Sequence, residues 1–472
     1  FPAAIPNNGL VSAIAAGSSA ILKPAPEARA VAAALVDQLH EAGVPQDLVQ
    51  LVCTPDNEVG THLVTHPGVD MVMLTGSIET AEMFQSWKPS MHLNAETSGK
   101  NAMVITAAAD IDQAIKELVK SAFGHAGQKC SAASLAIIEG SVYDDPTFHI
   151  RLADAVRSLA VGEATDFNNI VGPVINPPTG NLLRALTTLE PGEAWLVEPI
   201  KINETTFTPG VRKDVKPNSW FHLNECFGPV LGLMRASDLT HAVQLQNATQ
   251  YGLTGGIQSL DPKEIDFWLA NVQVGNAYVN RHITGAIVER QPFGGWKKSS
   301  IGPGQKPGGP NHLSGYGNWT EQGINIDSAI TDYKNQWNNY FTHEHDPTGL
   351  KSEANILRYF PVDKVYVRCS DPTAPEIDLM RAASALTGVP LEISVRSDES
   401  EAALGNRMQH ATGESRLRIL APATDELLSL AHQAGITVDT APVTGSGRLE
   451  LTHWLKEQAI SRTMHRYGRL LN

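Results

Sequence analysis

The chain has 472 residues, of which 42% are hydrophobic and 18% charged, a composition typical of a folded globular protein with room for two or three domains. The formal net charge of −14 at pH 7 argues against a nucleic-acid partner, because binding to a phosphate backbone needs clustered lysine and arginine. The most apolar early stretch, residues 9–22, is shorter than the roughly 20 apolar residues that cross a bilayer, so we expect a buried helix there and no integral membrane segment.

The cysteines indicate the redox environment. Their spacing matches neither a metal knuckle nor a disulfide framework, so we expect a reducing cytoplasm, no metal site and one functional thiol among Cys53, Cys130, Cys226 and Cys369.

The first part of the chain alternates helices with short apolar strands, which is typical of a doubly wound parallel sheet. Helices are predicted at 9–16, 28–42, 58–65 and from 78 onward, and strands at 20–23, 48–52 and 71–75. Strands at 91–96 and 102–106 then lead into a second α/β unit, in which a helix over 110–126 precedes Cys130.

A composition break rich in Gly, Pro, Asn and aromatic residues over 302–349 predicts a domain boundary. Its run 302–310 is predicted to be a structured loop and not a phosphate cradle, because it does not connect a strand to a helix start. A second alternation follows, with strands at 364–369, 391–395, 417–420 and 436–439, and helices at 375–386, 400–411, 425–435 and 454–471. This last region has no glycine-rich fingerprint and no catalytic motif, so a binding or structural role is expected.

Cys130, in Gly-Gln-Lys-Cys-Ser (127–131), and Glu96, in Glu-Thr-Ser-Gly-Lys (96–100), are the residues that indicate chemistry. A thiolate can attack an electrophilic carbon, and a carboxylate can activate the water that clears the acyl-enzyme. A free thiol is only slightly ionised at pH 7, so such a site must lower the pKa of the cysteine. The alternatives are a cysteine packed in a core and a solvent-exposed carboxylate.

Five motifs in a fixed order resemble those of the aldehyde dehydrogenase family. They are the segments 22–24, 74–77, 96–102, 127–134 and 225–229. The resemblance covers about residues 1–317, and the segments 275–281, 283–286 and 291–295 resemble the branch that oxidises L-glutamate γ-semialdehyde (Δ1-pyrroline-5-carboxylate).

The resemblance implies an α/β aldehyde dehydrogenase fold, with a Rossmann-like NAD-binding domain and an α/β catalytic domain, followed here by a smaller parallel-sheet domain. It implies NAD-dependent oxidation of the semialdehyde to L-glutamate, the second step of proline catabolism, through a thiohemiacetal and a thioester on Cys130, with Glu96 as the base. The alternatives are a dehydrogenase of another semialdehyde and an inactive assembly or interaction module.

The resemblance also assigns the cofactor site. Lys23 and Glu225 would bind the two ribose diols, Gly76 and Ser77 would lie under the pyrophosphate, and Phe227 would pack near the nicotinamide. An acidic residue that reads the ribose 2′-hydroxyl comes one position late in this chain, which leaves strict preference for NAD over NADP open.

For the substrate, the resemblance implies that Ser131 and the backbone of Gly285 and Ala286 anchor the α-carboxylate, while Phe293 encloses the carbon chain. Ser131 and Phe293 would thus bracket a short aldehyde that carries one carboxylate.

The beginning of the chain, Phe1-Pro2, resembles a point inside the family's first domain, so the front of that domain and its oxyanion-hole asparagine are expected to be missing. The extra C-terminal domain resembles that of long bifunctional proline-utilisation proteins, in which FAD belongs to an upstream proline dehydrogenase that this chain lacks. We expect a homo-oligomer acting on a small molecule, and four parts: 1–98 (partial NAD-binding domain), 99–317 (catalytic domain), 318–350 (linker or flap) and 351–472 (C-terminal Rossmann-like, non-catalytic domain).

Overall fold

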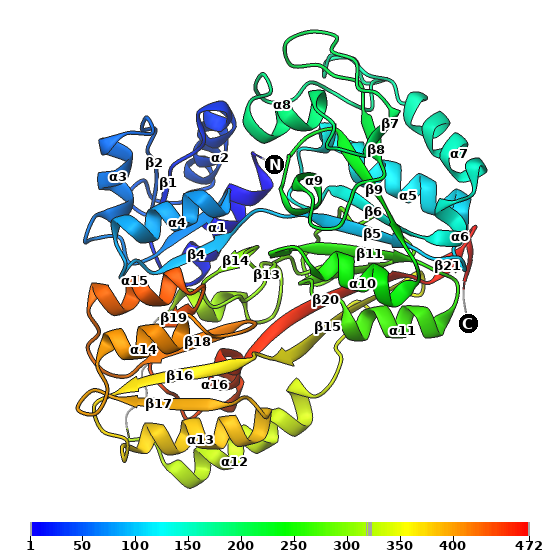
Figure 1. Cartoon of the computed structure of the whole chain (residues 1–472). Coiled ribbons are helices and arrows are strands. Elements are labelled where there is room, and N and C mark those ends of the chain that lie inside the picture. Colours follow the sequence, from blue (N-terminus) through cyan, green and yellow to red (C-terminus); the bar gives the residue numbers. More distant parts are fainter. Residues whose placement is uncertain (1, 318, 320–322, 471–472) are drawn as a thin grey trace. The chain divides into compact units, whose positions relative to one another are not determined.

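A computed structural model describes residues 2–317, 319 and 323–470 of the chain (Figure 1). The chain divides into two compact units. The first unit comprises residues 1–97, 300–344 and 358–457, and the second unit comprises residues 98–299, 345–357 and 458–472. No helix among the described residues is long and apolar enough to cross a membrane.

The N-terminal part of the first unit alternates helices and strands as predicted. Its elements are α1 (Ala4–Ala15), β1 (Ala20–Leu22), α2 (Arg29–Glu41), β2 (Val49–Leu51), α3 (Glu58–Thr65), β3 (Val72–Thr75), α4 (Ile78–Trp87) and β4 (Leu93–Glu96). Strands β1 and β2 pair in parallel, as do β3 and β4, and β14 (Ser300–Ile301) adds to β4 antiparallel. The Asn57 and Ser77 side chains cap α3 and α4, and these hydrogen bonds fix the residue at which each helix begins.

The apolar stretch 9–22 divides into a helix and a strand, as the predictions for 9–16 and 20–23 have it, and is not one buried helix. The helix covers Ala4–Ala15 and ends before Gly17, whose φ of +81° stops it, and only Leu10, Ser12 and Ala13 are buried. The rest of the apolar stretch forms the strand β1, so its hydrophobicity reflects two elements and not one.

The C-terminal part of the first unit is a parallel sheet in the order β17-β16-β18-β19 (Figure 1). The strands are β16 (Lys364–Cys369), β17 (Leu391–Val395), β18 (Ser415–Ile419) and β19 (Thr437–Asp439). One face packs against α12 (Ile326–Gln336) and α13 (Pro375–Thr387), and the other against α14 (Glu401–Met408) and α15 (Asp425–Gln433). The parallel sheet predicted after residue 351 is therefore confirmed, and the short helix α16 (Gly447–Glu450) follows it.

The segment 318–350 differs from a simple linker. Helix α12 and a π-helical turn (Trp337–Phe341) occupy its middle, and their buried side chains Tyr333 and Phe341 belong to the core of the C-terminal sheet. Residues 318 and 320–322 of this segment lie outside the described residues.

The second unit is built on a nine-stranded sheet in the order β15-β20-β12-β11-β5-β6-β9-β8-β7. Its strands are β5 (Asn101–Ile105), β6 (Ala133–Glu139), β7 (Ala194–Val197), β8 (Gly210–Lys213), β9 (Val230–Ala236), β11 (Thr254–Gln258), β12 (Asn276–Val279), β15 (Glu353–Pro361) and β20 (Leu455–Thr463). Every pair from β20 to β8 is parallel, and β7 runs antiparallel to β8. The division between the units passes through β15 and β20.

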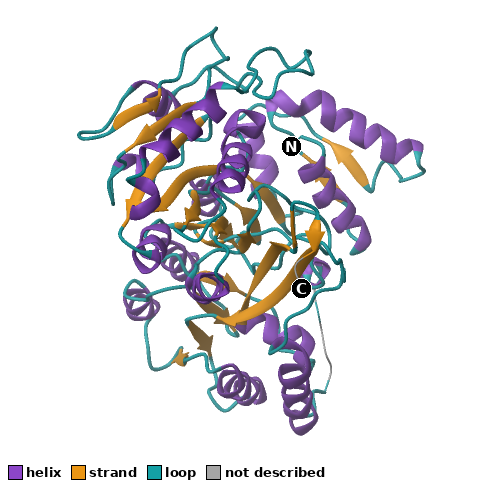
Figure 2. Ribbon diagram, turned by 90° about the vertical axis from the view of Figure 1, so that its right-hand side faces the viewer, coloured by secondary structure: helices purple, strands orange, loops and turns teal. Residues whose placement is uncertain are grey.

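Helices cover both faces of this sheet, as Figures 1 and 2 show. The longer ones are α5 (Ile111–Phe123) and α7 (Pro146–Arg157) on one face, and α10 (Leu239–Asn247) and α11 (Pro262–Asn271) on the other. The shorter elements are α6 (Gly140–Tyr143), α8 (Gly180–Thr187), α9 (Trp220–Leu223) and the pair β10 (Tyr251–Gly252) and β13 (Trp296–Lys297).

The helix predicted over 454–471 is wrong. The chain forms strand β20, which pairs in parallel with β12, and then the hairpin β21 (His465–Arg466) and β22 (Arg469–Leu470). Leu455, Glu457 and Ala459 have good helix propensity, but pairing with a neighbouring buried strand overrides it.

Candidate active site

Cys130 follows a turn that only a glycine can complete. Helix α5 ends at Phe123, three residues before the predicted end, because His125 and Ala126 take positive φ values of 56° and 53°. Gly127 also has a positive φ, of 68°, and a Cβ atom there would lie 2.2 Å from the Gly228 carbonyl oxygen. Strain of this kind is typical of functional loops.

Asn101 holds the backbone on the far side of the cysteine. Its Nδ2 donates to the carbonyl oxygens of Cys130, at 2.7 Å, and Ala132, at 3.0 Å, while its Oδ1 accepts from the Thr254 N–H at 2.9 Å. The Asn101 side chain is buried, so these bonds are not exchanged for water. Sequence reasoning missed Asn101, although it lies within the motif 96–102.

Cys130 is more accessible than two of the other thiols. It is half-buried, whereas Cys226 and Cys369 are buried, and burial raises the pKa of both of those thiols. Burial and the charge of Lys120 lower the pKa of Lys129, while the charge of Cys130 acts in the opposite direction. The Lys129 ammonium is therefore within electrostatic reach of the Cys130 sulfur, where a cation favours the thiolate.

Glu225 and Phe227 lie close to the backbone that flanks the cysteine loop. The Gly99 N–H donates to Glu225 Oε1 at 2.9 Å, and Gln128 Nε2 donates to the Phe227 carbonyl oxygen at 3.2 Å. The Phe227 ring remains 39% exposed on a residue with a φ of 54°. The structure therefore places these two predicted cofactor residues near the predicted nucleophile within the second unit.

A buried lysine supports this arrangement. Lys100 is buried with its Nζ 4.0 Å from the centroid of the Phe221 ring. Burial lowers its pKa, and the charges of Cys226 and Glu225 oppose that shift. Lys100 thus supplies positive potential near Glu225, a role that the sequence did not reveal.

The predicted substrate residues Gly285 and Ala286 lie on the loop that follows β12. The Tyr278 hydroxyl, on β12, donates to the Gly285 carbonyl oxygen, so this hydrogen bond attaches the loop to the sheet. Ala286 is exposed, whereas Phe293 is only 9% exposed.

Hydrogen bonds relate Ser131 to the end of that loop. Ser131 is buried, and its carbonyl oxygen accepts from Thr254 Oγ1 at 3.3 Å. Thr254 pairs with Asn276 in the sheet, and Asn276 bonds the Pro292 carbonyl oxygen at 2.9 Å and the Gly294 N–H at 3.0 Å. The residues on either side of Phe293 are therefore bonded to β12, which pairs with the strand β11 that bonds Ser131.

Glu96 and the predicted pyrophosphate turn lie in the first unit. Glu96 ends β4, and its carbonyl oxygen accepts from the Gly76 N–H at 3.1 Å. Ser77 caps α4, with its Oγ accepting from the Thr80 N–H at 3.2 Å. Gly76 is exposed directly before a helix start, and such a position suits an anion.

Lys23 follows β1 and makes an ion pair with Asp56, with 2.9 Å between Nζ and Oδ1. Asp56 is largely exposed, and such pairs contribute only about 0–1 kcal/mol. Lys23 can therefore exchange this partner for a hydroxyl of a ligand at little cost.

A second buried lysine lies in the electrostatic field of Glu96. Lys306 is buried, and its backbone N–H donates to Glu457 Oε2 at 2.9 Å. Burial lowers the pKa of the Lys306 side chain to about 8, against the opposing charges of Glu457 and Glu96. The sequence pattern, which predicts a structured loop over 302–310, gave no sign of this cation.

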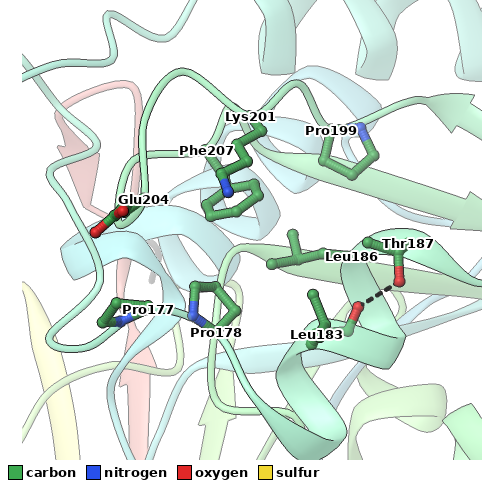
Figure 3. Close-up of a pocket in the computed structure, with 9 residues that line it drawn as sticks. All are labelled: Pro177, Pro178, Leu183, Leu186, Thr187, Pro199, Lys201, Glu204 and Phe207. Carbon is green, nitrogen blue, oxygen red and sulfur yellow. Dashed lines mark hydrogen bonds between the residues drawn. The ribbon is translucent and has the colours of Figure 1, made fainter.

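A surface pocket of about 620 Å³ in the second unit involves none of the predicted site residues (Figure 3). It is lined by Pro177, Pro178, Leu183, Leu186, Thr187, Pro199, Lys201, Glu204 and Phe207. The part of the chain that the structure describes contains no group of three His, Cys, Asp or Glu side chains placed to hold a metal ion.

Residues 1–320 match the profile of the Aldehyde dehydrogenase family, so the chain belongs to that family and has its fold. The resemblance inferred from the five motifs is confirmed.

Among similar proteins, the 1-pyrroline-5-carboxylate dehydrogenase of Bacillus subtilis (strain 168) is 35% identical over 324 residues, which is 66% of this chain and 62% of that protein. Proline Utilization A (PutA) from Corynebacterium freiburgense has a similar structure with a TM-score of 0.92 and 44% identity, covering 100% of this chain and 49% of that one. The 1-pyrroline-5-carboxylate dehydrogenase from Thermus with bound NAD matches with a TM-score of 0.62 and 32% identity over 67% of this chain and 62% of its own. The chain thus spans less than two thirds of the length of these relatives.

Proposed function

We propose that this chain carries the aldehyde-oxidising activity of an L-glutamate γ-semialdehyde dehydrogenase. The observation that carries the proposal is the Cys130 loop, in which a half-buried thiol lies between a glycine-dependent turn and the backbone bonds of Asn101. Similarity to proteins named 1-pyrroline-5-carboxylate dehydrogenase supports the choice of substrate.

In this proposal the Cys130 sulfur forms a bond to the aldehyde carbon, and the aldehyde oxygen takes up a proton to give a thiohemiacetal. NAD, when bound, would supply the acceptor for the hydride that leaves this carbon, and the hydroxyl proton passes to solvent, so that a thioester on Cys130 remains. Glu96 then removes a proton from water, the water oxygen attacks the thioester carbon, and the carbon–sulfur bond breaks. The products are L-glutamate and the free Cys130 thiol.

The cofactor proposal assigns Lys23, Gly76 and Ser77 to the adenosine ribose and pyrophosphate, and Glu225 and Phe227 to the nicotinamide end. Gly76 and Ser77 suit this role because Gly76 is exposed and directly precedes the N-terminus of α4, where the helix dipole favours an anion. Glu225 suits it because a carboxylate accepts hydrogen bonds from a ribose diol. NAD is preferred over NADP, and the NAD in the Thermus relative supports that choice.

The substrate proposal assigns Ser131 and the backbone of Gly285 and Ala286 to the α-carboxylate, and Phe293 to the carbon chain. Uncharged donors arranged for a carboxylate lose their partner when the aldehyde has none, at about 1–3 kcal/mol for each lost interaction. Such a site rejects neutral aldehydes more strongly than a pocket lined only by apolar side chains could.

For the whole protein we propose a homo-oligomer in the cytoplasm, with FAD bound only by a proline dehydrogenase region upstream of this chain. The similarity to PutA, of which this chain covers 49%, supports the upstream region. Within the chain, residues 1–98 would serve NAD binding, 99–317 catalysis and 351–472 a non-catalytic role, and the segment 318–350 would join the last two while its helix α12 packs in the core of the C-terminal sheet.

The substrate is tested by comparing glutamate semialdehyde with pentanal in the full-length natural protein, following NADH. The semialdehyde should be preferred by at least roughly a hundredfold in kcat/KM, and Ser131→Ala should narrow this gap mainly by weakening the semialdehyde. Equal use of pentanal would contradict the carboxylate anchor, preference for a different semialdehyde would redirect the substrate, and no NADH with any aldehyde would indicate an assembly module.

A further inference from the structure

The loop over residues 281–293, here called the substrate loop, is held at both ends by one carboxylate. Glu353, at the start of β15, lies with its Oε2 2.6 Å from Arg290 Nη2 and 3.5 Å from Arg281 Nη1. The side chains of Glu353 and Arg281 are only 20% and 12% exposed, so these contacts are much less screened than surface ion pairs.

A buried amide continues the contact. Asn355 Nδ2 donates to the same Glu353 oxygen at 3.2 Å, and Asn355 Oδ1 accepts from Gln291 Nε2 at 3.0 Å. Ser461, on β20, donates to Asn355 Oδ1 at 2.8 Å and also accepts from Gln291 Nε2 at 3.1 Å. Two residues of the segment 345–357 and one of β20 therefore fix the C-terminal end of the substrate loop.

Between these ends, the described loop residues contact the rest of the unit in the first part of the loop. The Ile283 N–H donates to Ser121 Oγ of α5 at 3.1 Å, His282 Nδ1 lies 3.3 Å from Glu117 Oε2 of the same helix, and the Gly285 carbonyl oxygen accepts from Tyr278 of β12. The tip beyond them is open, with Ile287 49% and Val288 70% exposed. The conformation of the tip therefore depends on how firmly its two ends are held.

The charges at the loop ends also bear on substrate binding. Burial raises the pKa of Glu353, but hydrogen bonds from Arg290 and Asn355 and the charge of Arg281 outweigh it, so the pKa lies below its usual value and the group is a carboxylate at neutral pH. The Arg290 guanidinium donates to Glu353, whereas Arg281 Nη1 donates to Ser461 Oγ at 2.5 Å and lies 3.5 Å from Glu353 Oε2. Glu353 thus offsets the positive charge at both ends of the substrate loop.

We propose that Glu353, together with Asn355, is a positioning pair that holds the substrate loop in the conformation that receives the substrate α-carboxylate. The inference rests on the proposed function of Gly285 and Ala286. It adds a determinant of substrate affinity that lies outside the substrate loop itself, on the segment 345–357. The pair acts by restricting the loop before substrate binds, so less conformational entropy is lost on binding.

The test compares Glu353→Ala and Glu353→Gln with the full-length natural protein, using glutamate semialdehyde and pentanal. For Glu353→Ala we expect KM for the semialdehyde to rise about tenfold or more, with kcat within about twofold and pentanal kinetics little changed. Glu353→Gln keeps an acceptor for one guanidinium, so its KM for the semialdehyde should lie between those of Glu353→Ala and the unsubstituted protein. Hydrogen exchange of the peptide containing residues 283–290 should be faster in Glu353→Ala, independently of any activity.

Arg290→Ala should show part of the effect of Glu353→Ala, and the double variant should be no worse than Glu353→Ala alone, because Arg290→Ala breaks one of the three contacts that Glu353→Ala breaks. Glu344→Ala, which removes an exposed carboxylate paired with Arg358 at 3.5 Å, serves as the control of equal charge and should leave KM unchanged. An unchanged or lowered KM in Glu353→Ala, or an equal loss with pentanal, would overturn the positioning role. If the unsubstituted protein itself fails to oxidise the semialdehyde, the proposed function fails instead, and faster exchange in Glu353→Ala would still report on the loop.

Discussion

Among the described sheets, the nine-stranded sheet of the second unit and the four-stranded C-terminal sheet of the first unit are each covered by helices on both faces, and they use their buried polar groups differently. In the sheet of the second unit, Asn101 and Lys100 lie at the start of β5. Asn101 donates a hydrogen bond to the Cys130 carbonyl oxygen, and Lys100 interacts electrostatically with Glu225. In the C-terminal sheet of the first unit, the buried Arg418 pairs with two carboxylates. The same architecture thus serves a reactive loop in one place and a stable core in the other.

One group of buried charges in the C-terminal sheet is centred on Arg418. Arg418 lies 3.2 Å from Asp439 and 2.7 Å from Glu450, and His453 lies 2.6 Å from Asp439. The Arg418 and Glu450 side chains are fully buried, and burial alone would raise the pKa of Asp439. Arg418 and His453 reverse that shift and hold the Asp439 pKa well below its usual value.

The two sheets also differ in their thiols. Cys369 ends β16 inside the core, where burial raises its pKa. Cys130 is half-buried and lies on the loop between α5 and β6. The sheet of the second unit thus carries its proposed nucleophile on a loop, whereas the buried thiol of the other sheet lies on a strand.

The largest difference between the two sheets should appear when each thiol is removed in turn. Cys130→Ala should lower kcat at least about 10⁴-fold, because no other group can form the thioester. Cys369→Ala should keep kcat within about twofold and cost about 1 kcal/mol of stability, as expected for a small deletion in a core. Steady-state NADH formation and urea unfolding measure the two effects, and appreciable turnover by Cys130→Ala would refute its role.

Asp439→Asn should have the opposite effect to Cys130→Ala, with a loss of stability in place of a loss of kcat. It leaves Arg418 with one carboxylate fewer in a buried setting, which should cost about 3–5 kcal/mol in the free energy of unfolding. Since the folded pKa of Asp439 is lowered, its stabilisation is fully present above its ordinary pKa of 3.8 and is lost as the pH falls further. Urea unfolding at pH 7 and pH 3 should show a large difference from the unsubstituted protein at pH 7 and a smaller one at pH 3. A constant difference would mean that packing, and not charge, explains the loss.

Gly127→Ala tests how far the reactive loop depends on its backbone. A methyl group at this positive φ meets the Gly228 carbonyl oxygen at 2.2 Å, so the turn must move and carry Cys130 with it. We expect a loss of about 100-fold in kcat/KM. Gly172→Ala is the matched control, because a Cβ atom there has no neighbour within 4 Å, and it should retain full activity. Equal activity of the two variants would show that the turn does not position the thiol.

Much of the fold followed from the sequence where local signals agreed with burial. Helix α3 was predicted over 58–65 and forms there, helped by the Asn57 cap, and the strand 364–369 forms as a buried apolar run. The segment 454–471 failed because residues with helix propensity pair with β12, a contact between parts of the chain far apart in sequence.

The site residues divide in the same way. Cys130 and Glu96 lie in motifs and were predicted from them, and the half-buried state of Cys130 agrees with a reactive thiol. Lys306 and Glu353 were missed because their importance comes from partners that no local pattern reveals. The contact between Arg290 and Glu353, for example, joins residues 63 positions apart.

The most direct test of covalent catalysis by Cys130 and Glu96 is a single-turnover experiment with Glu96→Gln in the full-length natural protein. Mixed with NAD and glutamate semialdehyde, this variant should release about one equivalent of NADH per site in a fast phase and then turn over slowly, because acylation proceeds while hydrolysis lacks its base. Acid quenching and peptide mapping should find the acyl group on Cys130. A variant that shows neither the fast phase nor an acyl group on Cys130, or that turns over like the unsubstituted protein, would contradict the account.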